Sequence, residues 1–256
     1  MSLESATAIV IRLVPWSEAS YVATLFTREL GRVRVVAKGA KRRKGPFEAA
    51  LDLLALCKVV FVRKSSDALD ILTEAKLQRR FRLRGRELAG LYAGYYVAEL
   101  LGELTDDYDP HPELFDLADR TLEDLQSESQ VGRRVLHFEL AALRMLGYLP
   151  ALTRCAECGA GIGGQGRVAF GPFSGGTLCP RCRGGKRQVV SLSQPAWQAL
   201  AALAQTDEPA GQQPPLARNT FAEIRTVMNQ YVGGLLGHEP RLQPYLTAAA
   251  ARMTSQ

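Results

Sequence analysis

Short runs of apolar and β-branched residues dominate the first 80 residues of the chain, and five of them predict strands. The predicted strands are residues 8–14, 21–27, 32–37, 56–63 and 69–76. In the third, Arg32 and Arg34 alternate with Val33 and Val35, which predicts a half-buried strand with a basic outer face. Five short strands in about 75 residues suit a small closed barrel of the OB type, a fold that binds oligonucleotides.

After this region the apolar residues recur at helical spacing, as Leu136, Leu140 and Leu143 do. Helices are predicted at residues 85–104, 112–128, 131–146, 194–204 and 216–236, with a weaker one at the end of the chain. Residues 106–109 (DDYD) and 207–215 (DEPAGQQPP) are predicted to be solvent-exposed turns or loops. The predicted fold is therefore α+β and multidomain. A barrel domain at 1–82 precedes a mostly helical domain at 83–256, which a metal-binding module at 150–190 interrupts.

The composition is that of a folded protein, but its charge is unevenly distributed. The 256 residues are 46% hydrophobic and 23% charged, which excludes wholesale disorder. No run of apolar residues is long enough for a membrane span, and the start lacks the pattern of a secretory signal, so a cytoplasmic protein that does not associate with membranes is expected. The net charge of +6 divides into +10 for residues 1–86 and −4 for the remainder. Clustered cations of this kind attract polyanions such as nucleic acids.

Two clusters of Lys and Arg provide most of this positive charge. The first is a basic loop that follows the third predicted strand, where Gly39 and Gly45 bracket most of the cations. The second lies between the barrel and the first helix. The residues predicted to bind DNA, on the strand and in these clusters, are Arg32, Arg34, Lys38, Lys41, Arg42, Arg43, Lys44, Arg79, Arg80 and Arg82. Either cluster could instead be an ordinary solvated surface. Of the aromatic residues Trp16, Tyr21, Phe47 and Phe61, most are expected in the core, although such side chains can stack on bases.

Four of the five cysteines form two CxxC pairs separated by twenty residues, Cys155 with Cys158 and Cys179 with Cys182. Two thiolates per tight turn can complete a tetrahedral S4 site, so one structural zinc ion per chain is predicted. Disulfides conflict with a cytoplasmic setting, and a redox motif needs only one pair. Cys57 lies in an apolar run and is expected in the core.

No catalytic motif is apparent, and the chain is predicted not to be an enzyme. His137 and Glu139 followed by a CxxC pair partly match the motif of zinc deaminases. However, proline follows Cys179 instead of preceding it, and the first CxxC pair would have no role. A zinc-dependent enzyme that modifies nucleic acids and a non-catalytic adaptor for an acidic protein remain the alternatives.

The order of these features resembles the RecO family of bacterial DNA repair and recombination mediator proteins. The most specific matching segments are GRVRVVAKGAKR in the strand region, and LGYLP followed by CAECG and CPRC. The resemblance spans nearly the whole chain and includes all four cysteine ligands. It matches Arg34, Lys38 and residues 41–44 to the basic barrel surface that the family uses for DNA.

The resemblance also implies function and partners. The implied activities are the binding of single- and double-stranded DNA and the annealing of complementary strands. In the RecFOR pathway, such a protein acts with RecR and helps to load RecA on DNA coated by the single-strand-binding protein SSB. The SSB C-terminal tail is expected to bind in the helical domain, with Arg133 and Arg134 as contributors.

Overall fold

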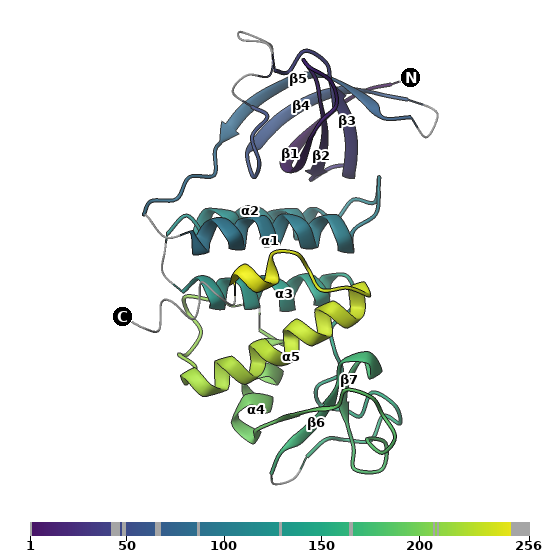
Figure 1. Cartoon of the computed structure of the whole chain (residues 1–256), viewed down its shortest axis with the longest axis vertical. Coiled ribbons are helices and arrows are strands. Elements are labelled where there is room, and N and C mark those ends of the chain that lie inside the picture. The colour runs from purple at the N-terminus through teal and green to yellow at the C-terminus, as the bar shows by residue number, and fades with distance from the viewer. Residues whose placement is uncertain are drawn as a thin grey trace. The chain divides into compact units, whose positions relative to one another are not determined.

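Five strands close into a barrel in the N-terminal part of the chain (Figure 1). The computed structural model describes residues 2–41, 47, 50–64, 68–85, 88–127, 130–163, 166–206, 208 and 210–246. The strands are β1 (Ser2–Pro15), β2 (Tyr21–Thr27), β3 (Gly31–Ala37), β4 (Leu56–Arg63) and β5 (Asp70–Arg79), in the order β1-β2-β3-β5-β4 around the barrel. This architecture confirms the predicted fold class.

The long strand β1 closes the barrel because it pairs with two neighbours. Its first half, from Ser2 to Ile9, is antiparallel to β4, and its second half, from Ala8 to Pro15, is antiparallel to β2. The register with β2 shifts between Val10 and Arg12, and a bulge of this kind bends a strand. The buried residues Val33, Val35, Val59 and Phe61 point to the interior and have no exposed surface.

Helices α1 (Ala89–Leu104) and α2 (Pro112–Asp124) belong to the same compact unit as the barrel, which comprises Met1–Gly132 and Pro244–Gln256. The ring of Phe26 on β2 stacks on Phe115 of α2 with 6.1 Å between the centroids. Nearby, the Arg28 guanidinium pairs with the Asp116 carboxylate at 2.8 Å. The predicted boundary at residues 82 and 83 divides the chain by type of secondary structure. The division of the chain into compact units rests on a different criterion and does not test this boundary, which stays a prediction.

The connection between α1 and α2 docks onto the barrel beside β3. Asp107 forms a parallel bridge with Arg32, and the Tyr108 backbone N–H donates to the Arg32 carbonyl oxygen at 2.9 Å. The Tyr108 hydroxyl donates to the Asp70 carboxylate at the start of β5. The prediction that this turn is merely solvated is therefore wrong for Asp107 and Tyr108, because the first half of β3 offers backbone groups that β5 does not reach.

The second compact unit, Arg133–Gln243, combines helices with a small sheet. Its helices are α3 (Val131–Met145), which begins just before the unit, α4 (Gln194–Leu203) and α5 (Arg218–Leu236). The strands β6 (Val168–Gly171), β7 (Gly176–Leu178) and β8 (Val190–Leu192) form a sheet in the order β7-β6-β8, and a 3-10 turn, η1 (Pro172–Ser174), joins β6 to β7. The Phe170 ring meets Tyr231 of α5 edge to face at 6.0 Å between centroids, which connects the sheet to the helices.

Several element boundaries differ from the predictions. β1 begins at Ser2 rather than residue 8, and the three strands β6–β8 were not predicted, because their segments are short and rich in glycine. In the predicted surface loop at 207–215, Ala210 and Gln213 are buried, so that part of the prediction is wrong. Within the described ranges, no helix combines the length and apolar character of a membrane span.

We expect Gly31→Ala to destabilise the barrel unit strongly. Gly31 has φ of +71°, and a Cβ there would collide with the backbone of Asp109 in the docked connection. A strained backbone and a clash together should lower the free energy of unfolding by about 2–4 kcal/mol. Chemical denaturation of the purified chain measures this loss.

Gly102→Ala in α1 provides the control. A Cβ at Gly102 meets only the Ile11 side chain, at an ordinary 3.9 Å, and alanine favours a helix over glycine. We expect stability to be unchanged or slightly higher. Equal losses for both variants would contradict the close approach at Gly31.

Candidate nucleic-acid interface and metal centre

The four cysteines of the two CxxC pairs lie together in the second unit. The Sγ atoms of Cys155, Cys158, Cys179 and Cys182 are all within 4.8 Å of one another. The Cys158 and Cys179 sulfurs are 3.8 Å apart. Zinc bonded to four sulfurs at about 2.3 Å has tetrahedron edges of about 3.8 Å, so the donor set fits a tetrahedral S4 site. These four cysteines can hold a metal ion.

Backbone N–H groups favour thiolates at this site. The Cys179 N–H donates to the Cys155 sulfur at 3.4 Å. Donors on Cys179, Cys158 and Glu157 lower the pKa of the Cys155 thiol to about 6. One backbone hydrogen bond closes the turn at each CxxC pair. The Gly159 N–H donates to the Cys155 carbonyl oxygen at the first pair, and the Cys182 N–H donates to the Cys179 carbonyl oxygen at the second. The pKa of the Cys179 thiol is also lowered, by backbone N–H donors, whereas hydrogen bonds with Cys179 and Cys158 raise the pKa of Cys182 to about 12. A cation that binds all four sulfurs as thiolates must therefore displace protons.

Cys57 has the opposite environment, as the sequence predicts. It lies in the barrel core with no exposed surface, and burial raises its pKa to about 12. Its thiol donates to the Ala50 carbonyl oxygen at 3.0 Å. Cys57 is therefore a core thiol and not a ligand.

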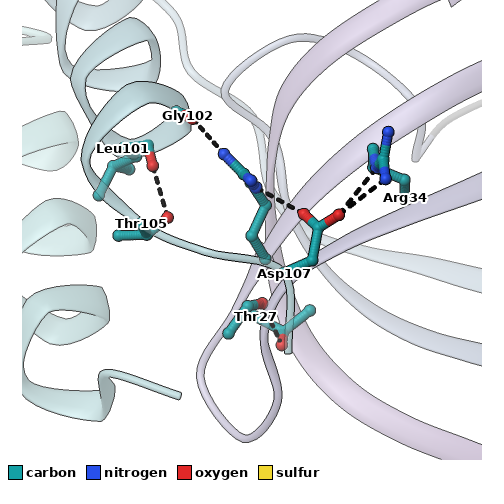
Figure 2. A network of polar contacts seen from close by, with 8 residues as sticks. Thr27, Arg34, Leu101, Gly102, Thr105 and Asp107 are labelled. Carbon is teal, nitrogen blue, oxygen red and sulfur yellow. Dashed lines mark hydrogen bonds and ion pairs between the residues drawn. The ribbon is translucent and has the colours of Figure 1, made fainter. Parts of the chain in front are cut away.

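Two of the predicted DNA-binding residues are engaged by a carboxylate (Figure 2). The Arg32 Nε donates to Asp107 Oδ1 at 2.7 Å, and Arg34 donates to Asp107 Oδ2 from Nε at 3.0 Å and pairs with it from Nη2 at 2.9 Å. Arg32 also donates to the Gly102 carbonyl oxygen and is 22% exposed, whereas Arg34 is 57% exposed. Arg32 thus holds the connection in place, while the side chain of Arg34 stays more than half exposed although Asp107 engages its guanidinium.

The basic loop starts beside an exposed aromatic residue. Lys38 is exposed, and the Lys41 ammonium donates to the Ser17 carbonyl at 2.7 Å and lies 4.9 Å from the centre of the Tyr21 ring. Trp16, in the same connection between β1 and β2 as Ser17, is 65% exposed. Arg42, Arg43 and Lys44 lie outside the described residues. Phe47 and Phe61 are core residues, as expected, so Trp16 and Tyr21 are the aromatic side chains left near the cations.

The second predicted cluster divides into structural and exposed cations. Arg79 donates to the Asp119 carboxylate and pairs with Glu123 at 3.1 Å, which ties the end of β5 to α2. Arg80 is half-buried, whereas Arg82 is exposed and only its backbone N–H bonds to Gln126. Arg82 is thus the member of this predicted set that is most available to a ligand.

The register of the barrel places further cations on its surface, of which Lys76 belongs to the second predicted cluster, whereas Lys58 and Arg12 lie outside the predicted set. Lys58 of β4 and Lys76 of β5 are direct partners in the ladder, and both are exposed. Like charges at paired positions destabilise a sheet, so a polyanion is their natural complement. Arg12 and Arg34 likewise share one row, because each pairs with Thr24. Sequence alternation could have placed these side chains on the outer face, but it could not show which strands are neighbours.

Arg133 borders a shallow depression in the second unit. Its guanidinium donates to the carbonyl oxygens of Gln213 and Pro214 at 2.8 and 2.9 Å. The depression is small, with a volume of about 10 Å³, and its lining comprises Arg133, Leu136, His137, Leu140, Leu203, Gln213 and Leu216. Arg134 is half-buried and is not part of this lining. A cation beside apolar side chains suits an acidic, apolar peptide.

Glu139 and His137 have structural roles in the described part of the chain. Glu139 is 1% exposed, and Arg225 of α5 donates two hydrogen bonds to its carboxylate. The Gln213 side chain donates to His137 Nδ1 at 3.2 Å. An ion-paired carboxylate is a poor proton shuttle, which argues against a deaminase-like role for Glu139.

A five-stranded barrel with an exposed cationic surface, joined to helices and a four-cysteine module, defines a class of nucleic-acid-binding proteins. Family models for the N-terminal and C-terminal parts of recombination protein O match residues 1–81 and 85–243. The chain belongs to the RecO family of DNA repair proteins, and it has a role in DNA repair and recombination. The family implies DNA binding and a place in the RecFOR pathway.

Curated relatives are similar over almost their whole length. The chain is 39% identical to the DNA repair protein RecO of Rhodopirellula baltica, over 93% of this chain and 97% of that protein. It is 34% identical to that of Anaeromyxobacter dehalogenans (strain 2CP-C), over 94% of each, and 30% identical to that of Myxococcus xanthus, over 90% and 91%.

We expect purified chain to contain about one zinc ion, and chelation to lower its melting temperature. Cys179→Ser should lose the metal because three thiolates remain, and the module should then unfold locally. Cys57→Ser is the matched control and should keep its zinc. Elemental analysis and thermal denaturation measure both effects, and a metal-free wild-type chain would contradict the assignment.

Proposed function

We propose that this protein is a non-catalytic recombination mediator that binds single- and double-stranded DNA and anneals complementary strands. With RecR it helps to load RecA on single-stranded DNA coated by SSB. One structural zinc ion stabilises its four-cysteine module. The observation that carries the proposal is the exposed cationic barrel surface in a chain of the RecO family.

The cations on this surface are available because few carboxylates lie against them. Arg12, Lys38, Lys58, Lys76 and Arg82 form no ion pair with a carboxylate among the described residues. Phosphate contacts from such side chains release counterions and carry no base preference. Trp16 adds an exposed ring on which a base can stack. Sequence-independent binding of this kind is what an annealing protein needs.

Annealing follows from the same charges. Two complementary strands repel each other through their phosphates, and bound cations reduce this repulsion. The cations sit on a rigid barrel, whereas Lys41 begins the basic loop that continues through residues 42–44. We infer that the loop and the barrel surface together hold one strand while its bases stay free to pair.

The depression beside Arg133 is the proposed site for the C-terminal tail of SSB. Leu203 and Leu216, both half-buried, offer apolar surface in this depression, and the Arg133 guanidinium lies at its edge. An acidic tail that ends in apolar residues matches both features, because its carboxylates meet the cation and its side chains displace water. No residue is assigned to RecR.

We expect reversal of residues 41–44 to Glu to weaken DNA binding and to flatten its salt dependence. Each lost phosphate contact reduces the slope of log K against log salt by about 0.7 for a single strand and about 0.9 for a duplex. Fluorescence anisotropy with labelled single strands and duplexes at two or more salt concentrations measures both quantities.

Two single reversals provide the matched comparison. Lys38→Glu should weaken binding, whereas Arg218→Glu, at the exposed start of α5, changes the net charge equally and should not. Unchanged affinity and slope in the reversed loop and in Lys38→Glu would reject the DNA surface and favour an adaptor for an acidic protein.

We expect a peptide with the sequence of the SSB tail to bind the wild-type chain. Leu203→Asp should abolish binding, because it puts a carboxylate at a half-buried position of the lining, opposite an acidic peptide. Anisotropy of the labelled peptide measures the affinity, and circular dichroism checks folding. A peptide with its acidic residues changed to Lys should not bind. Equal affinity for both peptides would contradict the assignment.

A further inference from the structure

The four-cysteine module carries a second cationic surface that the division of net charge along the chain conceals. Residues 150–190 contain six cations and one carboxylate, Glu157, and all six cations are exposed. A zinc ion bound by four thiolates adds a charge of −2, so the module stays positive when the metal is bound. The rest of the chain beyond residue 86 has 8 cations and 17 carboxylates. The module therefore has a net positive charge, whereas the rest of the chain beyond residue 86 has a net negative charge.

Four of these cations lie in one short turn around the second knuckle. The turn is held by hydrogen bonds from the Arg183 N–H to the Cys179 carbonyl and from the Lys186 N–H to the Arg183 carbonyl. Arg181, Arg183 and Arg187 form no ion pair with the residues in the described ranges. Gly184 and Gly185 in the middle of the turn face open space, so a phosphate can approach the backbone.

An exposed aromatic ring belongs to the same surface. Phe173 in the η1 turn is 65% exposed. The Lys186 ammonium donates to the Glu157 carboxylate at 2.6 Å, and the side chain of the next residue, Ser174, also hydrogen-bonds this carboxylate. One edge of the Phe173 ring lies near Gly234 of α5. Glu157 thus links the ring-bearing turn to the basic turn.

We propose that the metal module is a second binding surface for single-stranded DNA, with phosphates on Arg181, Arg183 and Arg187 and a base stacked on Phe173. Guanidinium groups bind phosphate oxygens, and an adjacent exposed ring is the arrangement that favours a single strand over an acidic protein. The proposal rests on the proposed function, and it assigns DNA contacts to a unit other than the barrel. One chain then engages a strand at two places, or two strands at once.

The test compares the intact chain with three charge variants and two variants of Phe173, using a labelled oligothymidine and anisotropy across a series of salt concentrations. The module variant is Arg181→Glu with Arg183→Glu and Arg187→Glu. Its charge-preserving control carries Lys at the same three positions. The third variant is the reversed loop at residues 41–44, which tests the barrel independently.

We expect the module variant to lose at least about tenfold in affinity near 0.1 M salt, with a slope smaller by about 2, since each phosphate contact on a single strand contributes about 0.7. The Lys control should retain the slope. Phe173→Ala should weaken binding and leave the slope unchanged, whereas Phe173→Trp should retain the affinity of the wild type because its ring can also stack on a base. Zinc content equal to that of the wild type in every variant shows that the module is folded.

An unchanged affinity and slope in the zinc-loaded module variant would overturn this proposal, whatever the barrel variant does. If, in the same experiment, reversal of residues 41–44 weakens DNA binding, the proposed function is still supported. If the barrel variant binds normally and the module variant does not, the module proposal holds and the barrel assignment fails.

Discussion

The docking of the α1–α2 connection beside β3 is the contact on which the rest of the barrel unit depends. β3 and β5 pair in parallel at only Val35 and Val36, so the first half of β3 needs another partner. Asp107 and Tyr108 supply it through backbone bonds to Arg32 and through the Tyr108 hydroxyl on Asp70. The same segment lies against Gly31, where no side chain fits. The docked connection therefore completes the part of the β3 edge that β5 leaves unpaired.

This contact divides the barrel's cations between structure and binding. Asp107 neutralises part of Arg32 and Arg34, and Arg79 is occupied by two carboxylates on α2. The cations that remain, such as Lys58 and Lys76, face solvent on strands that pair with each other. Ion pairs at partly exposed positions contribute little to stability, so their main effect is to fix which arginines a phosphate can reach. Net charge alone does not describe such a surface.

Much of this architecture follows from the sequence because it depends on local patterns. Alternation predicted five strands, and the spacing of Cys155, Cys158, Cys179 and Cys182 predicted a cluster that the structure brings within 4.8 Å. The burial of Gln213 and the bond from Tyr108 to Asp70 were not predictable, because each depends on a partner distant in the chain. Polar turns look alike in sequence whether they are solvated or docked. Asp107, the carboxylate that engages the predicted DNA contacts Arg32 and Arg34, lies in such a docked turn.

A second cationic surface changes what annealing by a single chain requires. If only the barrel bound DNA, two chains would have to meet before two strands could pair. In our proposal, two DNA-binding surfaces on one chain would make the second encounter intramolecular. Both surfaces carry cations and an exposed ring, Trp16 on the barrel side and Phe173 in the metal module. A module that only stabilised the fold would not need so many exposed arginines without ion-pair partners among the described residues. The proposed binding of DNA gives these arginines a role.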